Sequence, residues 1–318
     1  MKYSKLFWFV ELKEIEDYYN RLKKGETIEI KEFSGKTKEL CTSGSTTGKP
    51  KYVTVNKEQL ELRFAAEWYT MELTGWKRGE RWVHLWYPLV REHKDSKSNK
   101  EKLSLKRKYE NCLFLSYFNL NDNMMKDYYY KIKKFKPKLL VSYSEAVWIF
   151  ANFLDKNNLR LNIPYVISSG GHLYPEWRKV IEKTMNSKVF NRLGCSEFGV
   201  IAQEDRKGNM RIVSQRGLSV KKGNNNELLI TDINNKAIVF KDYNLGDTGK
   251  IKDDIITDLK GKIKSGKSYL RIFQNTIEKT ELICIRCNGI VDVDKNKGTL
   301  ANPLCGKCLK ERDEKQNN

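Results

Sequence analysis

One decapeptide stands out because it combines hydroxyl groups, glycines and lysines: Thr42-Ser43-Gly44-Ser45-Thr46-Thr47-Gly48-Lys49-Pro50-Lys51. Its two glycines permit positive φ and close approach, so that successive backbone N–H groups can converge on an anion. The hydroxyl groups add further donors, and Lys51 adds a positive charge at the end of the run. The decapeptide therefore predicts a loop that binds a triphosphate.

A Walker A loop is the first alternative, and the spacing excludes it. That loop has four residues between its glycines and ends in Lys-Ser or Lys-Thr. Here three residues separate Gly44 from Gly48, and Lys49 is followed by Pro50. Proline removes a backbone N–H and keeps the preceding residue out of the helical region, so no helix begins where a Walker A helix must. An ordinary polar turn remains the other alternative.

Downstream of the decapeptide, helical patterns alternate with short apolar strands. We expect helices over residues 123–135, 144–157 and 174–185, and strands over 138–143, 164–169 and 188–193. This alternation predicts an α/β fold, a mostly parallel sheet flanked by helices, with its site at the carboxyl ends of the strands. From residue 210 onward, short strands over 211–214, 227–232 and 237–241 predict an antiparallel subdomain.

Local signals give further expectations about where helices begin. The apolar run of residues 6–10 is interpreted as part of a first amphipathic helix. A strand over 52–55 leads to a second helix, for which Asn56 and Gln59 resemble a capping box. Ser144 is expected to cap the helix that it begins. Residues 81–90 are aromatic and prone to form a strand.

Four pieces of the sequence together resemble the adenylate-forming superfamily, which includes acyl- and aryl-CoA ligases, luciferases and peptide-synthetase adenylation domains. They are the decapeptide, Gly170-Gly171, Gly194-Cys195-Ser196-Glu197 and Tyr243-Asn244-Leu245-Gly246-Asp247, and they occur in the order typical of that superfamily. Residues 135–144 and 227–243 further resemble the phenylacetate–CoA ligase branch, especially its capsule-biosynthesis-type members. The resemblance covers residues 42–249. It implies that ATP activates a small-molecule carboxylate as an acyl-adenylate, with release of pyrophosphate.

The resemblance also implies roles for individual residues. The ATP phosphates would be held by residues of the decapeptide, among which Lys51 would be catalytic: Thr42, Ser43, Gly44, Ser45, Thr46, Thr47, Gly48 and Lys51. The rest of the nucleotide site would be formed by Ser169, Gly170 and Gly171 along the adenine, Asn191 at its exocyclic amine, and Arg192, Gly194 and Ser196 nearby. Glu197 would be catalytic and hold Mg²⁺, which prefers oxygen ligands. Asp247 would accept both ribose hydroxyls.

Three features depart from the pattern of that superfamily. Leu193 replaces the usual tyrosine, and His172 stands where many members carry glutamate. Only 71 residues follow Asp247, and they contain no match for the lysine that the superfamily's mobile C-terminal domain supplies. We therefore expect an efficient first half-reaction, and transfer to an acceptor (coenzyme A, a carrier protein or RNA) that needs a partner's help.

Four cysteines in the last part of the chain have the spacing of a zinc ribbon. Cys284 and Cys287 form one pair, Cys305 and Cys308 the other, and seventeen residues lie between the pairs. Four thiolates would make a closed structural Zn²⁺ site. The sequence thus predicts two domains, an ATP-binding core over 1–270 and a zinc-ribbon module over 271–318. We find no secretory signal and no apolar run of the ~18 residues of a membrane span, which favours a cytoplasmic protein without a membrane partner.

The net charge of +20 suggests an alternative function. Two basic runs, residues 91–108 and 126–138, each carry an excess of five Lys and Arg over Asp and Glu (eight against three, and six against one). A solvated loop and a helix with a basic face are one interpretation. The other is a nucleotide-binding module with little chemistry that docks RNA or another polyanion.

Overall fold

The computed structural model of the chain describes residues 9–41, 52–86, 107–117 and 120–261, and the backbone of 282–283 and 290–291. One compact unit holds the described residues of 9–41, 52–117 and 122–261, and a second holds the short strands β14 (Leu282–Ile283) and β15 (Ile290–Val291). The decapeptide, residues 91–106 of the first basic run and the four paired cysteines lie outside the described residues.

A single mixed sheet forms the centre of the first unit. Among the described strands its order is β10-β11-β12-β13-β9-β8-β7-β6-β5-β3-β4. One half is parallel and consists of β4 (Cys112–Ser116), β3 (Trp82–Trp86), β5 (Leu139–Tyr143), β6 (Tyr165–Ser169) and β7 (Lys188–Cys195). The other half is antiparallel and consists of β8 (Gly199–Glu204), β9 (Met210–Ile212), β13 (Ile255–Lys260), β12 (Phe240–Lys252), β11 (Glu227–Asp232) and β10 (Leu218–Lys222). The predicted antiparallel subdomain therefore continues the parallel sheet.

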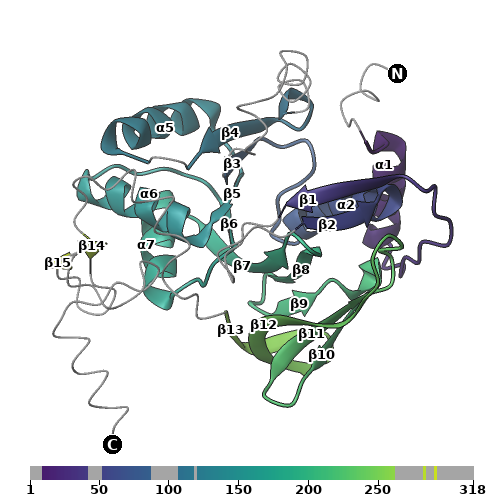
Figure 1. The fold of residues 1–318 in the computed structure, drawn as a ribbon. Helices are drawn as coiled ribbons and strands as arrows, with labels where there is room; N and C mark the ends of the chain where they lie inside the picture. Colours follow the sequence, from purple (N-terminus) through teal and green to yellow (C-terminus); the bar gives the residue numbers. More distant parts are fainter. Residues whose placement is uncertain are drawn as a thin grey trace, which may run out of the picture. The chain divides into compact units, whose positions relative to one another are not determined.

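Helices cover both sides of the parallel strands (Figure 1). On one side lie α5 (Asp122–Phe135), α6 (Ser144–Lys156) and α7 (Pro175–Met185), and on the other lie α1 (Leu12–Lys23) and α2 (Lys57–Glu72). Covering on both sides explains why β5 and β6 are apolar along most of their length and almost fully buried. A separate antiparallel pair, β1 (Thr37–Cys41) with β2 (Tyr52–Asn56), leads into α2.

Apolar clusters among the described residues pack this unit, and three of them show how the elements are joined. The first joins α1, α2 and β2 around Ile15, Leu22 and Val55. The second fills the antiparallel half of the sheet, and the third packs the end of α2 against the parallel strands. In α2, burial extends round the helix and includes the polar side chains of Gln59, Glu61 and Arg63. This helix therefore lies inside the unit and is not a surface helix with a single apolar stripe.

Two of the local expectations about helix starts are wrong. Phe9 and Val10 precede α1 in a bend, so the described part of the apolar N-terminal run is not helical. Asn56 precedes α2 but makes no side-chain cap, because its Oδ1 accepts the backbone N–H of Lys236 (2.9 Å). The amide that would close a capping box is thus committed to a contact between distant parts of the chain.

Two further expectations fail because side-chain hydrogen bonds compete with the expected local structure. Ser144 is the first residue of α6 and makes no cap, since its hydroxyl donates to the carbonyl of Gly171 (3.0 Å). The strand expected over 237–241 begins only at Phe240, because Ala237 lies in a turn in which its N–H donates to Asn235 Oδ1 (3.2 Å). The Ser144 hydroxyl thus bonds to a distant part of the fold, whereas the Ala237 N–H is taken up by the side chain of a near neighbour.

Candidate functional site

The carboxyl end of β6 forms the first part of the candidate site. Gly170 follows this strand at φ 73°, and a Cβ there would stand 2.5 Å from the ring of Tyr143, so only glycine fits. The Ser144 hydroxyl donates to the carbonyls of Gly171 (3.0 Å) and Ser169 (3.4 Å), and it accepts a hydrogen bond from Ser168 Oγ (2.7 Å). The Ser144 hydroxyl therefore holds the backbone of residues 169–171 from the buried side, while Gly171 remains exposed.

Aromatic side chains gather at the same edge of the sheet. Trp86, the last residue of β3, stacks on Tyr143, the last residue of β5, with ring centroids 3.9 Å apart. Tyr117 meets Tyr143 edge to face at 5.0 Å. Because β3, β5 and β6 are parallel neighbours, their carboxyl ends bring these rings next to Gly170. The edge thus offers a flat apolar wall beside a glycine backbone, which suits an organic ligand.

The hairpin between β7 and β8 forms the second part. Its register shifts between Leu193 and Gly194, as in a β-bulge, a feature that often re-aims side chains next to functional sites. A Cβ on Gly194 would stand 2.8 Å from the carbonyl oxygen of Gly199, and Gly199 itself has φ 71°. The two glycines allow the tight turn that carries the exposed Ser196 and the half-buried Glu197.

Glu197 influences two titratable neighbours. Burial, and next the Glu197 carboxylate, raise the pKa of the Cys195 thiol to about 12. Burial and the same carboxylate also raise the pKa of Tyr243 on β12. Such a shift favours the protonated form of the Cys195 thiol, which is the less reactive form.

Asp247 lies in β12, four residues beyond Tyr243, and is partly buried. Its Oδ1 is 3.7 Å from the position that a Cβ on Gly261 would take. Between the two, Leu245 packs into the same apolar cluster as Leu193 and Cys195. The sheet thus brings the strand that carries Asp247 against the hairpin that carries Glu197.

The two remaining predicted residues of β7 lie between these parts. Asn191 donates its backbone N–H to Glu204 Oε2 (2.8 Å), and the residue is half-buried. The guanidinium of Arg192 is buried, with Nε donating to Gln203 Oε1 (2.7 Å) and Nη2 to Thr70 Oγ1 (3.2 Å). Burial lowers the pKa of Arg192 to about 10, and Glu67 opposes that effect. These bonds direct the Arg192 side chain toward α2.

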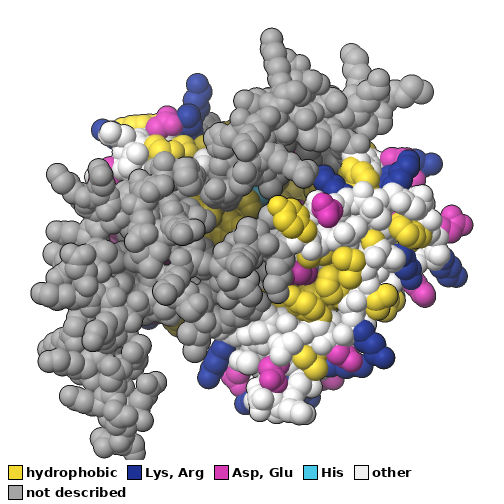
Figure 2. Space-filling view, in the orientation of Figure 1, with side chains coloured by type: hydrophobic (Ala, Val, Ile, Leu, Met, Phe, Trp, Pro, Cys, Tyr) yellow, Lys and Arg dark blue, Asp and Glu magenta, His cyan; other side chains and the backbone are white. Residues whose placement is uncertain are grey.

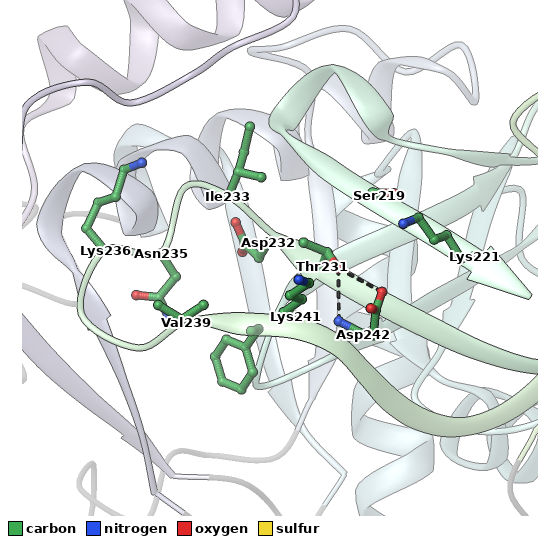
Figure 3. Close-up of a pocket in the computed structure, with 11 residues that line it drawn as sticks. Ser219, Lys221, Thr231, Asp232, Ile233, Asn235, Lys236, Val239, Lys241 and Asp242 are labelled. Carbon is green, nitrogen blue, oxygen red and sulfur yellow. Dashed lines mark hydrogen bonds between the residues drawn. The ribbon is translucent and has the colours of Figure 1, made fainter. Parts of the chain in front are cut away.

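A surface pocket lies in the antiparallel half of the sheet, on β10, β11 and the start of β12 (Figure 3). Its volume is about 410 Å³, and Lys221, Lys236 and Lys241 are among its lining residues. Thr231 and Asp242 are hydrogen-bonded to each other in its wall. None of the predicted site residues lines this pocket.

The predicted basic and metal-binding features can be compared with the described part of the structure. The second basic run forms α5, whose lysines are exposed, as expected for a helix with a solvated basic face. On the face drawn in Figure 2, the described Lys and Arg side chains are interspersed with Asp and Glu rather than gathered in one patch. Within the described ranges there is no group of three or more His, Cys, Asp or Glu that could hold a metal ion. Nor does any described helix have the length and apolarity that crossing a membrane requires.

Sequence reasoning missed several residues that shape these parts. Tyr143 and Trp86 could have been found, because each ends a strand at the edge where sites form. Two arginines, Arg63 and Arg216, are buried beneath the hairpin that carries Glu197. No local signal marks them, because the carbonyls that they bind lie far away along the chain.

Comparisons with known proteins give the context of this fold. No family model matches the chain. The chain is similar to Protein CapK of Staphylococcus aureus, with 25% identity over 218 residues, which are 67% of this chain and 48% of that protein. It is also similar to the crystal structure of 2-hydroxyisobutyryl-CoA ligase in an open conformation with 2-HIB-AMP and CoA (TM-score 0.54, 11% identity, 76% of this chain and 58% of that one). The postadenylation state of the same ligase with R3-HIB-AMP gives a TM-score of 0.53 and 12% identity, over 84% of this chain and 62% of that one.

These likenesses establish the fold. The described unit is a mixed α/β domain like those of adenylate-forming ligases, with a large sheet flanked by helices. The chain spans about half the length of the curated relative and about three fifths of the solved ligase.

Proposed function

We propose that this chain activates a carboxylate with ATP. A carboxylate oxygen of the substrate bonds to the α-phosphorus, and pyrophosphate leaves. One observation carries the proposal: the segments 169–171 and 194–197 follow or end the neighbouring parallel strands β6 and β7, at the sheet edge where such folds bind ligands. The likeness to a ligase crystallised with 2-HIB-AMP supports the same chemistry.

The residues of this edge have properties that suit the proposed roles. Gly170 and Gly171 expose backbone beside an aromatic wall, where the flat adenine could lie. Glu197 is a half-buried carboxylate and Mg²⁺ takes carboxylate and phosphate oxygens, so the donor fits this ion. Mg²⁺ bound with the nucleotide would neutralise phosphate charge. Asp247 accepts the ribose hydroxyls, and the decapeptide binds the phosphates, with Lys51 as a catalytic cation. Adenylation is then mainly a matter of positioning and charge stabilisation.

The finer assignment concerns the branch and the acceptor. The resemblance of residues 135–144 and 227–243 supports the phenylacetate–CoA ligase-like, capsule-biosynthesis-type branch. The acceptor is coenzyme A, a carrier protein or RNA, of which coenzyme A is favoured by the ligand of the solved ligase. We further propose that the second half-reaction uses a partner.

We also propose that residues 271–318 form a zinc ribbon through Cys284, Cys287, Cys305 and Cys308. Its support is the spacing of the cysteines. Strands β14 and β15 pair antiparallel, with residue 283 opposite residue 290, and the first cysteine pair lies between them in the sequence.

The test of nucleotide binding is calorimetry with ATP and Mg²⁺. We expect the chain to bind, and Asp247→Ala to weaken binding about tenfold or more, because two hydrogen bonds to a charged acceptor are lost. Asp258→Ala is the matched control, since this exposed aspartate lies on the neighbouring strand and pairs with Lys250 at 2.8 Å. Absence of binding by the unmodified chain, or equal binding by the two variants, would contradict the assignment.

A further inference from the structure

The carbonyl groups of the hairpin that carries Glu197 are held by two buried arginines. Arg63 on α2 donates Nη1 to the carbonyl of Ser196 (2.9 Å) and Nη2 to that of Glu197 itself. Arg216 donates Nη1 to the carbonyls of Phe198 (2.5 Å) and Val200 (2.7 Å). The two rigid, planar guanidinium groups thus donate hydrogen bonds to four carbonyls of one short turn.

The same arginines are tied to α2 and to β11 by one acid. Asp232 Oδ2 accepts Gln59 Nε2 (2.8 Å) and lies 3.6 Å from Arg216 Nη2. Burial, and next the charge of Arg216, lower the pKa of Arg63 to about 9, whereas Asp232, Cys195 and Glu197 oppose this. Two buried guanidinium groups therefore share one buried carboxylate, and Glu197 also favours the charged form of Arg63.

Stability alone is a poor reason for this arrangement. Among the residues that the structure describes, the buried Nε atoms of Arg63 and Arg216 and the buried Oε1 of Gln59 have no hydrogen-bond partner. Well-packed apolar residues of similar volume would avoid that desolvation cost. The guanidinium groups fix the positions of the carbonyls at residues 196 and 197. Apolar side chains could not do this, because they donate no hydrogen bonds.

We propose that Arg63 is a positioning residue for Glu197. It acts through the backbone of the hairpin, and it joins Glu197 to α2, which follows the decapeptide in sequence through β2 alone. The two N–H donors of the planar Arg63 guanidinium fix both the position and the orientation of the turn. The role in nucleotide binding rests on the proposed function, whereas the holding of the turn does not.

The test compares three variants that differ in what they remove. Arg63→Lys keeps the charge but cannot donate to two carbonyls in the same geometry. Arg63→Gln removes the charge and serves as the second variant should the lysine chain not fold. Met71→Ala is the control, because this buried residue of the same helix lies in a different cluster and its truncation destabilises without touching the turn.

Two readouts separate the inference from the proposed function. In hydrogen exchange without nucleotide, we expect peptides over residues 194–200 to exchange about tenfold faster in Arg63→Lys than in Met71→Ala, as loss of a buried hydrogen bond implies. The Mg²⁺ concentration for half-maximal ATP binding should rise by a similar factor in Arg63→Lys only. Exchange in the turn equal to that of the control overturns the positioning role. Faster exchange in a chain that never binds ATP supports the holding of the turn and refutes the proposed function instead.

Discussion

Asp205 shows how a single carboxylate can organise a hairpin of this sheet. Between β8 and β9 it accepts the backbone N–H groups of Lys207 (2.8 Å) and Asn209 (3.0 Å), and it pairs with Arg211 Nε at 2.6 Å. Burial alone would raise the pKa of Asp205, but the hydrogen bonds from these three residues together outweigh it and lower the pKa from 3.8 to about 2. The folded state therefore favours the ionised form.

This shift gives a prediction about stability and pH. A lowered folded-state pKa stabilises the protein above pH ~4, and the contribution is lost as the pH falls toward ~2. We expect Asp205→Asn to lower the free energy of unfolding at pH 7 by about 2 kcal/mol, from the size of the shift. The difference between variant and unmodified chain should shrink to nothing near pH 2 in denaturant titrations. Glu29→Gln, at an exposed position, is the control, and a variant difference that does not change between pH 7 and 2 would refute the assignment.

At the residue scale, the sequence predicts those site residues whose chemistry is local. Gly170 is needed where a strand ends in a tight turn, and a glycine pair after a buried strand is visible in the sequence. Arg63 and Arg216 are not predictable, because their partners are carbonyls more than a dozen residues away along the chain. The same limit explains Asn56 and Ser144, whose side chains bond to distant backbone instead of capping helices.

At the scale of elements, periodicity predicts α5, α6 and α7 and strands β5, β6 and β11 to within a few residues. Each is a continuous apolar or amphipathic segment bounded by turn residues. Strands β8, β10 and β13 are not predicted from the periodicity of the sequence. β8 follows directly from the tight turn after β7, so the two form one uninterrupted stretch of sequence. β10 and β13 carry several charged residues, because much of their surface is exposed.

The zinc ribbon is the prediction that belongs to this scale. We expect about one Zn²⁺ per chain, since four thiolates at this spacing fit a tetrahedral structural site. Cys284→Ser should lose most of the bound metal, whereas Cys112→Ser, which changes a cysteine of β4, should keep it. Elemental analysis of protein purified without chelator decides the matter. A zinc-free chain, or equal zinc in the two variants, would show that the cysteine pairs serve another purpose.

At the scale of the whole molecule, the alternation of helices and strands predicts the α/β class and the parallel half of the sheet. It does not predict that the antiparallel strands extend the same sheet. That continuity depends on the β7–β8 hairpin, whose bulge and two glycines reverse the chain within the sheet plane. The hairpin thereby brings Glu197 toward the strand that carries Asp247.

The rival hypothesis of a polyanion-binding module concerns the surface as a whole. It would require basic side chains gathered on one face. The described lysines of α5 form a solvated helix face, and Figure 2 shows both signs of charge interspersed on the side that it draws. Among the described residues, the face drawn in Figure 2 thus carries mixed charge and shows no basic patch of the kind that this hypothesis requires.

The most direct measurement of the central claim is carboxylate-dependent exchange of labelled pyrophosphate into ATP. This reaction needs only the first half-reaction and no acceptor. We predict that at least one member of a library of carboxylic acids supports exchange by the unmodified chain with Mg²⁺. Glu197→Gln should lower the rate by ~10²-fold or more, comparable to the loss of one preorganised electrostatic contact. A chain that binds ATP with Mg²⁺ yet exchanges no pyrophosphate with any acid, or a Glu197→Gln variant that exchanges at the unmodified rate, would contradict the account.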